Sequence, residues 1–154
     1  MMNLKTLSSK QSKQLLDWLI AAFLGFGFTG LIDSAYLTAK YYSGSPLECQ
    51  ILIGCDIVAT SQYAEIFHAP VALLGVIYYL LIVSLIALYV KTKKENVLIG
   101  VSFLTIFGFL ASLWFLYLQL FVIKALCFYC IVSAAASTAL FISGIIFIRK
   151  FNAR

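Results

Sequence analysis

Four long apolar runs constrain the fold of this chain more than any other feature. A membrane-spanning helix needs about 20 mostly apolar residues, and the runs cover approximately residues 15–40, 69–90, 97–123 and 126–148. The second of them contains no charged residue. We therefore predict an all-α integral membrane protein in which four transmembrane helices form one bundle, as a single domain over residues 1–154.

The composition agrees with this prediction and excludes other classes of protein. Of the 154 residues, 63% are hydrophobic and 11% are charged, whereas a soluble domain has about 45–50% and about 25%. This balance excludes a soluble enzyme, a disordered chain and a nucleic-acid-binding protein. The lysines before the first run are also typical of a secretory signal peptide, but the run is too long for one and no clear cleavage site follows it.

The positions of the basic residues predict the orientation in the membrane. Short loops rich in Lys and Arg stay on the cytoplasmic side. Nine of the eleven basic residues precede the first run, separate the second run from the third, or follow the fourth, and only Lys40 and Lys124 fall on the other side. We therefore predict a multi-pass protein of the cell membrane (inner or plasma membrane) with both termini in the cytoplasm. A polybasic surface that binds anionic lipids is the alternative explanation of the charge.

The connection between the first two runs is too long to be a simple turn. Residues 43–68 contain three acidic residues and no Lys or Arg, and a loop longer than about 12–15 residues is usually functional or disordered. Segments 51–53 and 63–67 are apolar enough to pack on the membrane surface. We expect an ordered extracytoplasmic cap that includes a short helix.

All four cysteines fall on the same predicted side of the membrane. Cys49 and Cys55 lie in the long outer loop, and Cys127 and Cys130 lie at the outer end of the fourth run. Disulfides form and persist outside the cytoplasm. We therefore expect the cysteines to act in pairs.

The second pair has the spacing of a reactive dithiol. Cys127 and Cys130 are three residues apart at a predicted helix start, where i and i+3 side chains share a face and the helix dipole lowers a thiol pKa. Cys130 is about 4.5 Å deeper along the helix axis, so it is better placed to meet a molecule dissolved in the lipid. Two structural disulfides or a zinc site made of all four cysteines are the alternatives. The zinc site is disfavoured, because five residues separate Cys49 from Cys55, whereas structural zinc sites usually have two to four residues between neighbouring ligands. We therefore predict no metal.

Thiol–disulfide exchange can pass electrons from one pair to the other, so a terminal acceptor is needed. The sequence contains no haem ligation pair, no flavin or dinucleotide glycine motif and a single His. A quinone of the ubiquinone or menaquinone type is the expected cofactor, because it dissolves in lipid and takes up two electrons and two protons.

From Leu15 to about Ile148 the chain resembles the prokaryotic homologues of vitamin K epoxide reductase, the VKOR family. The matching motifs are Tyr36-Leu37-Thr38, Cys49-x5-Cys55-Asp56-x4-Ser61, Pro70-Val71-Ala72-Leu73-Leu74-Gly75 and Cys127-x-x-Cys130. The resemblance implies a four-helix bundle around a quinone, capped by the loop that carries the first cysteine pair.

The resemblance also implies a role for each catalytic cysteine and for Ser61. Cys49 would exchange with a thioredoxin-fold (DsbA-like) partner, Cys55 would pass electrons to Cys127, and Cys130 would reduce the quinone, with Ser61 near the quinone. The net reaction would be disulfide bond formation in exported proteins. No thioredoxin-like domain follows in this sequence, so we expect the partner to be a separate protein.

Two further residues bear on function. Asp33 is an acid inside the first run, level with the expected quinone, and intramembrane acids are candidates for a functional role. It is a candidate cofactor-binding residue or proton relay, and local pairing with Ser34, Thr29 or a backbone group is the favoured alternative. Ala134 stands where the animal enzymes have a tyrosine that contributes to binding the vitamin, so epoxide reduction is the less favoured activity. A non-catalytic membrane protein whose disulfides hold an interaction cap is the remaining alternative.

Overall fold

The computed structural model describes residues 4–47 and 54–151, and four long helices dominate it. They are α1 (Leu4–Ser43), α3 (Val71–Thr92), α4 (Glu95–Tyr117), which continues as the π-helix η1 (Leu118–Ile123), and α5 (Phe128–Phe151). All four are long and apolar enough to cross a membrane. The prediction of an all-α, four-helix membrane bundle is therefore confirmed.

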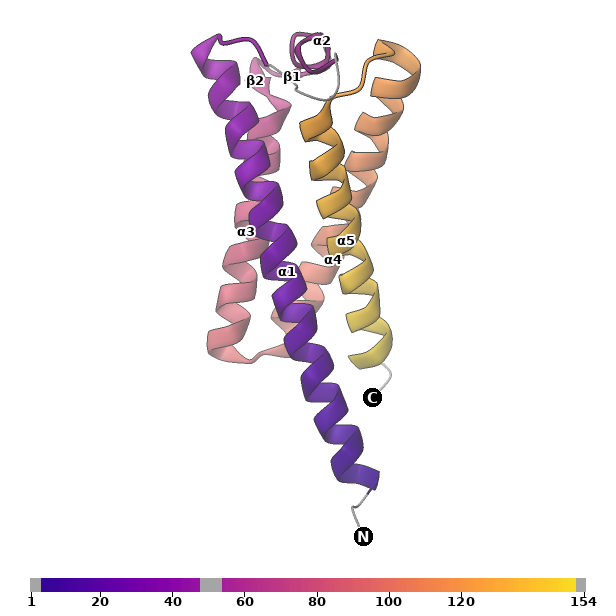
Figure 1. The fold of residues 1–154 in the computed structure, drawn as a ribbon. Helices are drawn as coiled ribbons and strands as arrows, with labels where there is room; N and C mark the ends of the chain where they lie inside the picture. Colours follow the sequence, from indigo (N-terminus) through magenta and orange to yellow (C-terminus); the bar gives the residue numbers. More distant parts are fainter. Residues whose placement is uncertain (1–3, 48–53, 152–154) are drawn as a thin grey trace.

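The helices form a closed ring in which the adjacent pairs are α1–α3, α3–α4, α4–α5 and α5–α1. Both termini lie at one end of this ring, and the cap lies at the other (Figure 1). In lipid, helices associate through close packing of small residues. Gly30 shows this directly, because a Cβ at that position would overlap the ring of Tyr79 on the neighbouring helix α3.

The two halves of the bundle are packed differently. The half nearer the termini has a solid core that contains Phe23 from α1, Ile82 and Ile86 from α3, Leu98 from α4 and Leu140 from α5, all fully buried. The half nearer the cap instead contains a partly open cavity of about 940 Å³. The solid half holds the helices together, so the other half can remain open for a ligand.

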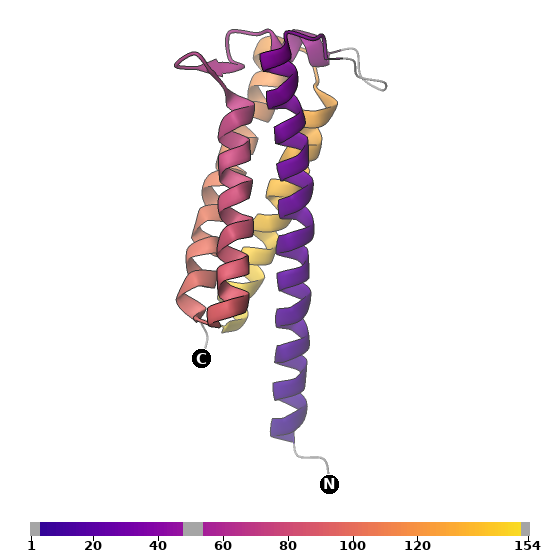
Figure 2. The same ribbon diagram turned by 90° about the vertical axis from the view of Figure 1, so that its left-hand side faces the viewer.

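Helix α1 is longer than the apolar run that predicted it. The run indicated a start near residue 15, but the helix begins at Leu4 and projects beyond the other helices (Figure 2). Lys and Gln favour helix as well as most apolar residues do, so the polar segment continues the helix outside the part that an apolar pattern detects. At the other three helices the predicted and observed ends differ by two or three residues at most.

The cap contains the expected short helix and also a hairpin that the sequence analysis did not predict. Helix α2 (Cys55–Ala59) is followed by β1 (Glu65–Ile66), which pairs antiparallel with β2 (Ala69–Pro70). The turn between the strands has positive φ at both Phe67 and His68. A two-residue hairpin of this geometry normally contains Asn or Gly, which is why the pattern of residues gave no signal for it.

Candidate active site

The end of the bundle that carries the cap brings three of the four cysteines together. Cys55 begins α2, Cys127 directly precedes α5, and Cys130 lies in the first turn of α5. Cys55 and Cys127 belong to one buried cluster, each with 1% of its surface exposed, and Cys130 packs against them. Cys49, the fourth predicted catalytic residue, lies outside the described residues.

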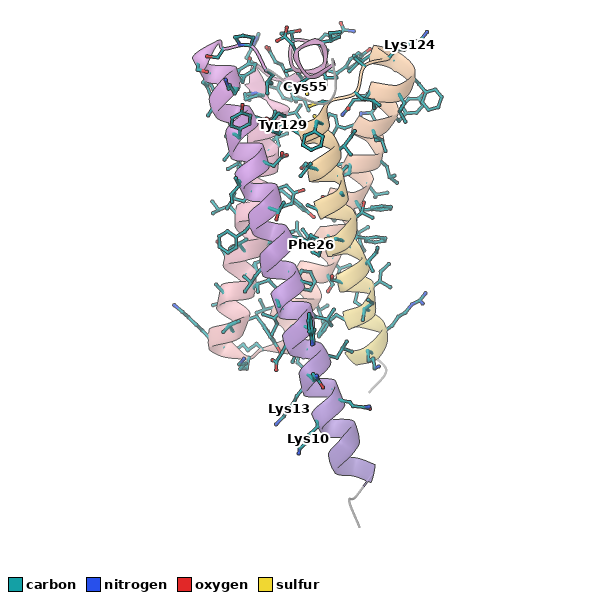
Figure 3. All side chains as sticks on the ribbon, viewed as in Figure 1. Lys10, Lys13, Phe26, Cys55, Lys124 and Tyr129 are labelled. Atoms are coloured by element: carbon teal, nitrogen blue, oxygen red, sulfur yellow. The ribbon has the colours of Figure 1, made fainter. Side chains whose placement is uncertain are left out.

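A glycine allows α2 to approach the connection between η1 and α5. A Cβ added to Gly54 would lie 2.6 Å from the carbonyl oxygen and 2.8 Å from the amide nitrogen of Leu126. Any side chain at this position would therefore push α2 away from the segment that carries Cys127. The absence of a side chain at residue 54 places Cys55 against the start of α5 (Figure 3).

The N-terminus of α5 donates hydrogen bonds to sulfur atoms of both cysteine pairs. The Phe128 N–H donates to Cys55 Sγ at 3.4 Å, and the Cys130 N–H donates to Cys127 Sγ, also at 3.4 Å. The first N–H groups of a helix have no partner within the helix and favour negative charge nearby. Cys55 is disulfide-bonded, whereas Cys127 and Cys130 are free thiols.

These contacts make Cys127 the more acidic thiol at this junction. The hydrogen bond with the Cys130 side chain holds the pKa of Cys127 below its ordinary value, and the backbone N–H groups of Cys130 and Tyr129 act in the same direction. Burial and the negative charge of Asp33 oppose this lowering without cancelling it. A thiol with a lower pKa is a better leaving group in disulfide exchange, so Cys127 is suited to be released from a mixed disulfide.

Cys130 lines the large cavity, which is mostly apolar and has a few polar groups on its wall. A cavity of this size and character is typical of a small-molecule site. Tyr79, Ser133 and Ser137 lie on one side of it, and the Tyr79 hydroxyl donates to the Ser133 carbonyl oxygen at 2.8 Å. The size, the apolar wall and the adjoining thiol fit a quinone ring.

Ser61 and Ala134 also line this cavity. The Ser61 hydroxyl donates to the Val58 carbonyl oxygen at 2.8 Å, so its oxygen is left to accept a hydrogen bond. The methyl group of Ala134 offers no hydrogen bond to a ligand. The wall of the cavity therefore lacks the tyrosine hydroxyl that the animal enzymes have at this position.

Asp33 is not among the residues that line the large cavity. It lies in a separate groove between α1 and α5, beside Tyr36 and Tyr129. Only 8% of its surface is exposed, and its Oδ2 has no hydrogen-bond partner among the described residues. Ser34 and Thr29 donate to backbone carbonyls of α1 and not to this carboxyl group.

One polar residue of the site, Gln119, was not predicted from the sequence. It is 4% exposed, lines the large cavity, and accepts a hydrogen bond from the Cys127 N–H at its Oε1 (3.1 Å). The available signal was weak: Gln119 is a lone polar side chain in the apolar segment 118–123, eight residues before Cys127.

Comparison with known proteins agrees with this arrangement. Residues 21–145 match the sequence profile of the Vitamin K epoxide reductase family. The chain belongs to this family. The VKOR family match covers the cavity, α2 and the start of α5, and thus every described residue of the site.

A plant protein gives a second comparison. The chain is 34% identical over 122 residues to the thiol-disulfide oxidoreductase LTO1 of Arabidopsis thaliana. The match covers 72% of this chain but 32% of that protein. The chain thus spans about a third of the length of this VKOR family relative.

Proposed function

We propose that the protein is a membrane thiol oxidoreductase that passes electrons from a separate thioredoxin-fold (DsbA-like) protein through Cys49/Cys55 and Cys127/Cys130 to a quinone. It would thereby drive disulfide bond formation in exported proteins. The observation that carries the proposal is the position of the Cys55 and Cys127 sulfurs at the N-terminus of one helix, α5.

The exchange between the pairs follows from this position. A Cys55 thiolate attacks the Cys127 sulfur of the inner disulfide, a Cys55–Cys127 bond forms, and Cys130 leaves with the electron pair of the broken bond. Cys49 then attacks Cys55, which restores the outer disulfide and releases Cys127 as a thiol. Two electrons have then moved from the outer pair to the inner pair.

The inner pair adjoins the cavity, where oxidation can be completed. When bound there, a quinone would accept two electrons and two protons. Both Cys127 and Cys130 line the cavity. Cys130 lies about 4.5 Å further along α5 from the cap, so its sulfur would be the one that reduces the ligand. The hydroxyl groups of Ser133 and Ser137 offer polar contacts to a carbonyl oxygen of the ligand.

The orientation in the membrane belongs to the same proposal. Lys10 and Lys13 lie at the end of the bundle opposite to Cys55 (Figure 3). If the basic end is cytoplasmic, both cysteine pairs face the oxidising compartment. Plain quinone reduction is favoured over epoxide reduction because Ala134 brings no hydroxyl group to the cavity.

A trapping experiment tests the entry point for electrons. In a Cys55→Ala variant, Cys49 has no resolving partner, so a mixed disulfide between Cys49 and the thioredoxin-fold protein should accumulate in oxidising cells. Non-reducing electrophoresis and mass spectrometry would detect the adduct. The matched control is the Cys49→Ala/Cys55→Ala double variant, which should form none. Recovery of only reduced Cys49 from the single variant would contradict the proposed electron route.

A further inference from the structure

Gln119 has an unused hydrogen-bond donor in the wall of the large cavity. We propose that its side-chain amide donates a hydrogen bond to one carbonyl oxygen of the quinone and orients the ring toward Cys130. This inference rests on the proposed function, because it concerns the same cavity and the same ligand. Its test measures binding without electron transfer, so the two can fail separately.

The side chain of Gln119 points into the bundle although the residues that follow it do not. Gln119 is buried, whereas Leu120 and Phe121 are exposed. Its backbone helps to close the π-helical turn η1, because the Gln119 carbonyl oxygen accepts the N–H groups of Lys124 and Ala125. Turns of this kind are frequent at functional sites. The side chain lines the cavity together with the inner cysteine pair.

The hydrogen bond to Cys127 fixes which end of the amide remains available. The Gln119 Oε1 accepts the Cys127 N–H at 3.1 Å, so the other end is the nitrogen with its two N–H donors. In the described part of the chain, no oxygen atom accepts a hydrogen bond from this nitrogen. The nitrogen is also not one of the inaccessible polar atoms that lack a partner there. Since the buried side chain lines the cavity, the N–H donors are open to it.

Other polar side chains of the cavity wall donate to the protein itself. The hydroxyl groups of Ser34, Ser61 and Tyr79 each donate to a backbone carbonyl oxygen. Their oxygens can still accept a hydrogen bond, but a quinone carbonyl has no proton to donate. Gln119 differs from these three residues, because its N–H donors remain for a ligand. A buried donor without an acceptor is unfavourable, so a carbonyl group beside Gln119 would bind favourably.

A donor beside the inner cysteine pair would also favour the reaction. When the two thiols are oxidised, a Cys127–Cys130 bond forms and two electrons and two protons pass to the quinone. Negative charge develops on a carbonyl oxygen until it is protonated, and a hydrogen bond to a charged group is stronger than one to a neutral group. The bond from Gln119 to the Cys127 backbone holds this donor next to the thiols.

Binding of two matched ligands tests this role. The full chain in lipid nanodiscs, with both cysteine pairs oxidised so that no electrons pass, would be titrated with isotope-labelled menadione and with methylnaphthalene, which has the same rings but no carbonyl group. Gln119→Leu should weaken the binding of menadione about tenfold, because a buried hydrogen bond is lost, and should change that of methylnaphthalene less than about twofold. Gln62, which is exposed on the cap, provides the matched control Gln62→Leu, which should bind both ligands like the parent.

The infrared carbonyl bands of bound menadione give a readout that a merely structural role would not move, and they also cover a failure of Gln119→Leu to fold. In the parent, one band should lie at a lower frequency than in a hydrocarbon solvent, and in Gln119→Met it should return toward the solvent value. Parent bands at the solvent frequencies, unchanged affinity of Gln119→Leu for menadione, or an equal loss of affinity for both ligands would overturn the inference alone. Failure of the parent to bind menadione would overturn the proposed quinone as well.

Discussion

At the scale of single residues, the reactivity of Cys127 depends on its neighbour. The hydrogen bond with the Cys130 side chain is the largest contribution that lowers the pKa of Cys127. In a Cys130→Ala variant this hydrogen bond is lost while the Cys127 thiol stays buried, so the pKa of Cys127 should rise. The pH profile of Cys127 alkylation in the reduced protein should therefore shift to higher pH. Cys130→Ser, which keeps a hydroxyl donor, should shift it less, and an unchanged profile in Cys130→Ala would contradict this account.

The candidate residues differ in how well the sequence revealed them. The C-x-x-C spacing marked Cys127 and Cys130 because a helix start imposes a known geometry on that spacing. Gln119 was missed because its importance comes from a chain reversal at residues 124–127, which places its side chain beside a cysteine eight positions later. Asp33 was identified as an intramembrane acid, but only the structure shows that it lies outside the large cavity.

At the scale of elements, the contact between α2 and the η1–α5 connection controls exchange between the pairs. In a Cys49→Ala/Cys130→Ala background, oxidation should join Cys55 to Cys127. Adding Gly54→Ala should reduce the rate of this bond formation about tenfold or more, because a displacement of about 1 Å misaligns the reacting sulfurs.

The size of the Gly54→Ala effect follows from the clash that the added methyl group would make, and a second glycine provides its control. The new methyl group would lie 2.6 Å from the Leu126 carbonyl oxygen, whereas a Cβ at Gly100 would have no atom within 4 Å. Overpacking of this kind costs about 1–3 kcal/mol, while Gly100→Ala should leave the rate unchanged. Equal rates for both variants would show that close docking of α2 is not required.

The elements themselves were predictable to different degrees. Twenty apolar residues in a row admit few structures other than a transmembrane helix, so all four spans were predicted near their observed positions. The polar start of α1, the π-helical η1 and the hairpin β1–β2 were not. Hydropathy does not separate an α-helix from a π-helix, and Phe67 and His68 are not residues that typically form a two-residue turn.

At the scale of the whole molecule, the division of the bundle into a solid half and a hollow half explains how a small membrane protein holds a ligand. The sequence alone could not show this division, because the membrane-spanning parts of the helices are apolar in both halves of the bundle. It arises from which side chains meet: large aliphatic and aromatic groups near the termini, and smaller groups such as Ser34, Gly75 and Ala134 around the cavity.

The central claim is that electrons leave the protein through Cys130 to a quinone, and a direct assay of quinone reduction tests it. Purified protein would be supplied with a reduced thioredoxin-fold protein and a soluble quinone, and quinol formation would be followed by absorbance. The parent protein should catalyse the reaction, and Cys130→Ala should lower its rate at least about 100-fold, because the inner disulfide cannot form and Cys127, which also lines the cavity, lies nearer to the cap. Catalysis by Cys130→Ala at the parent rate would contradict the account.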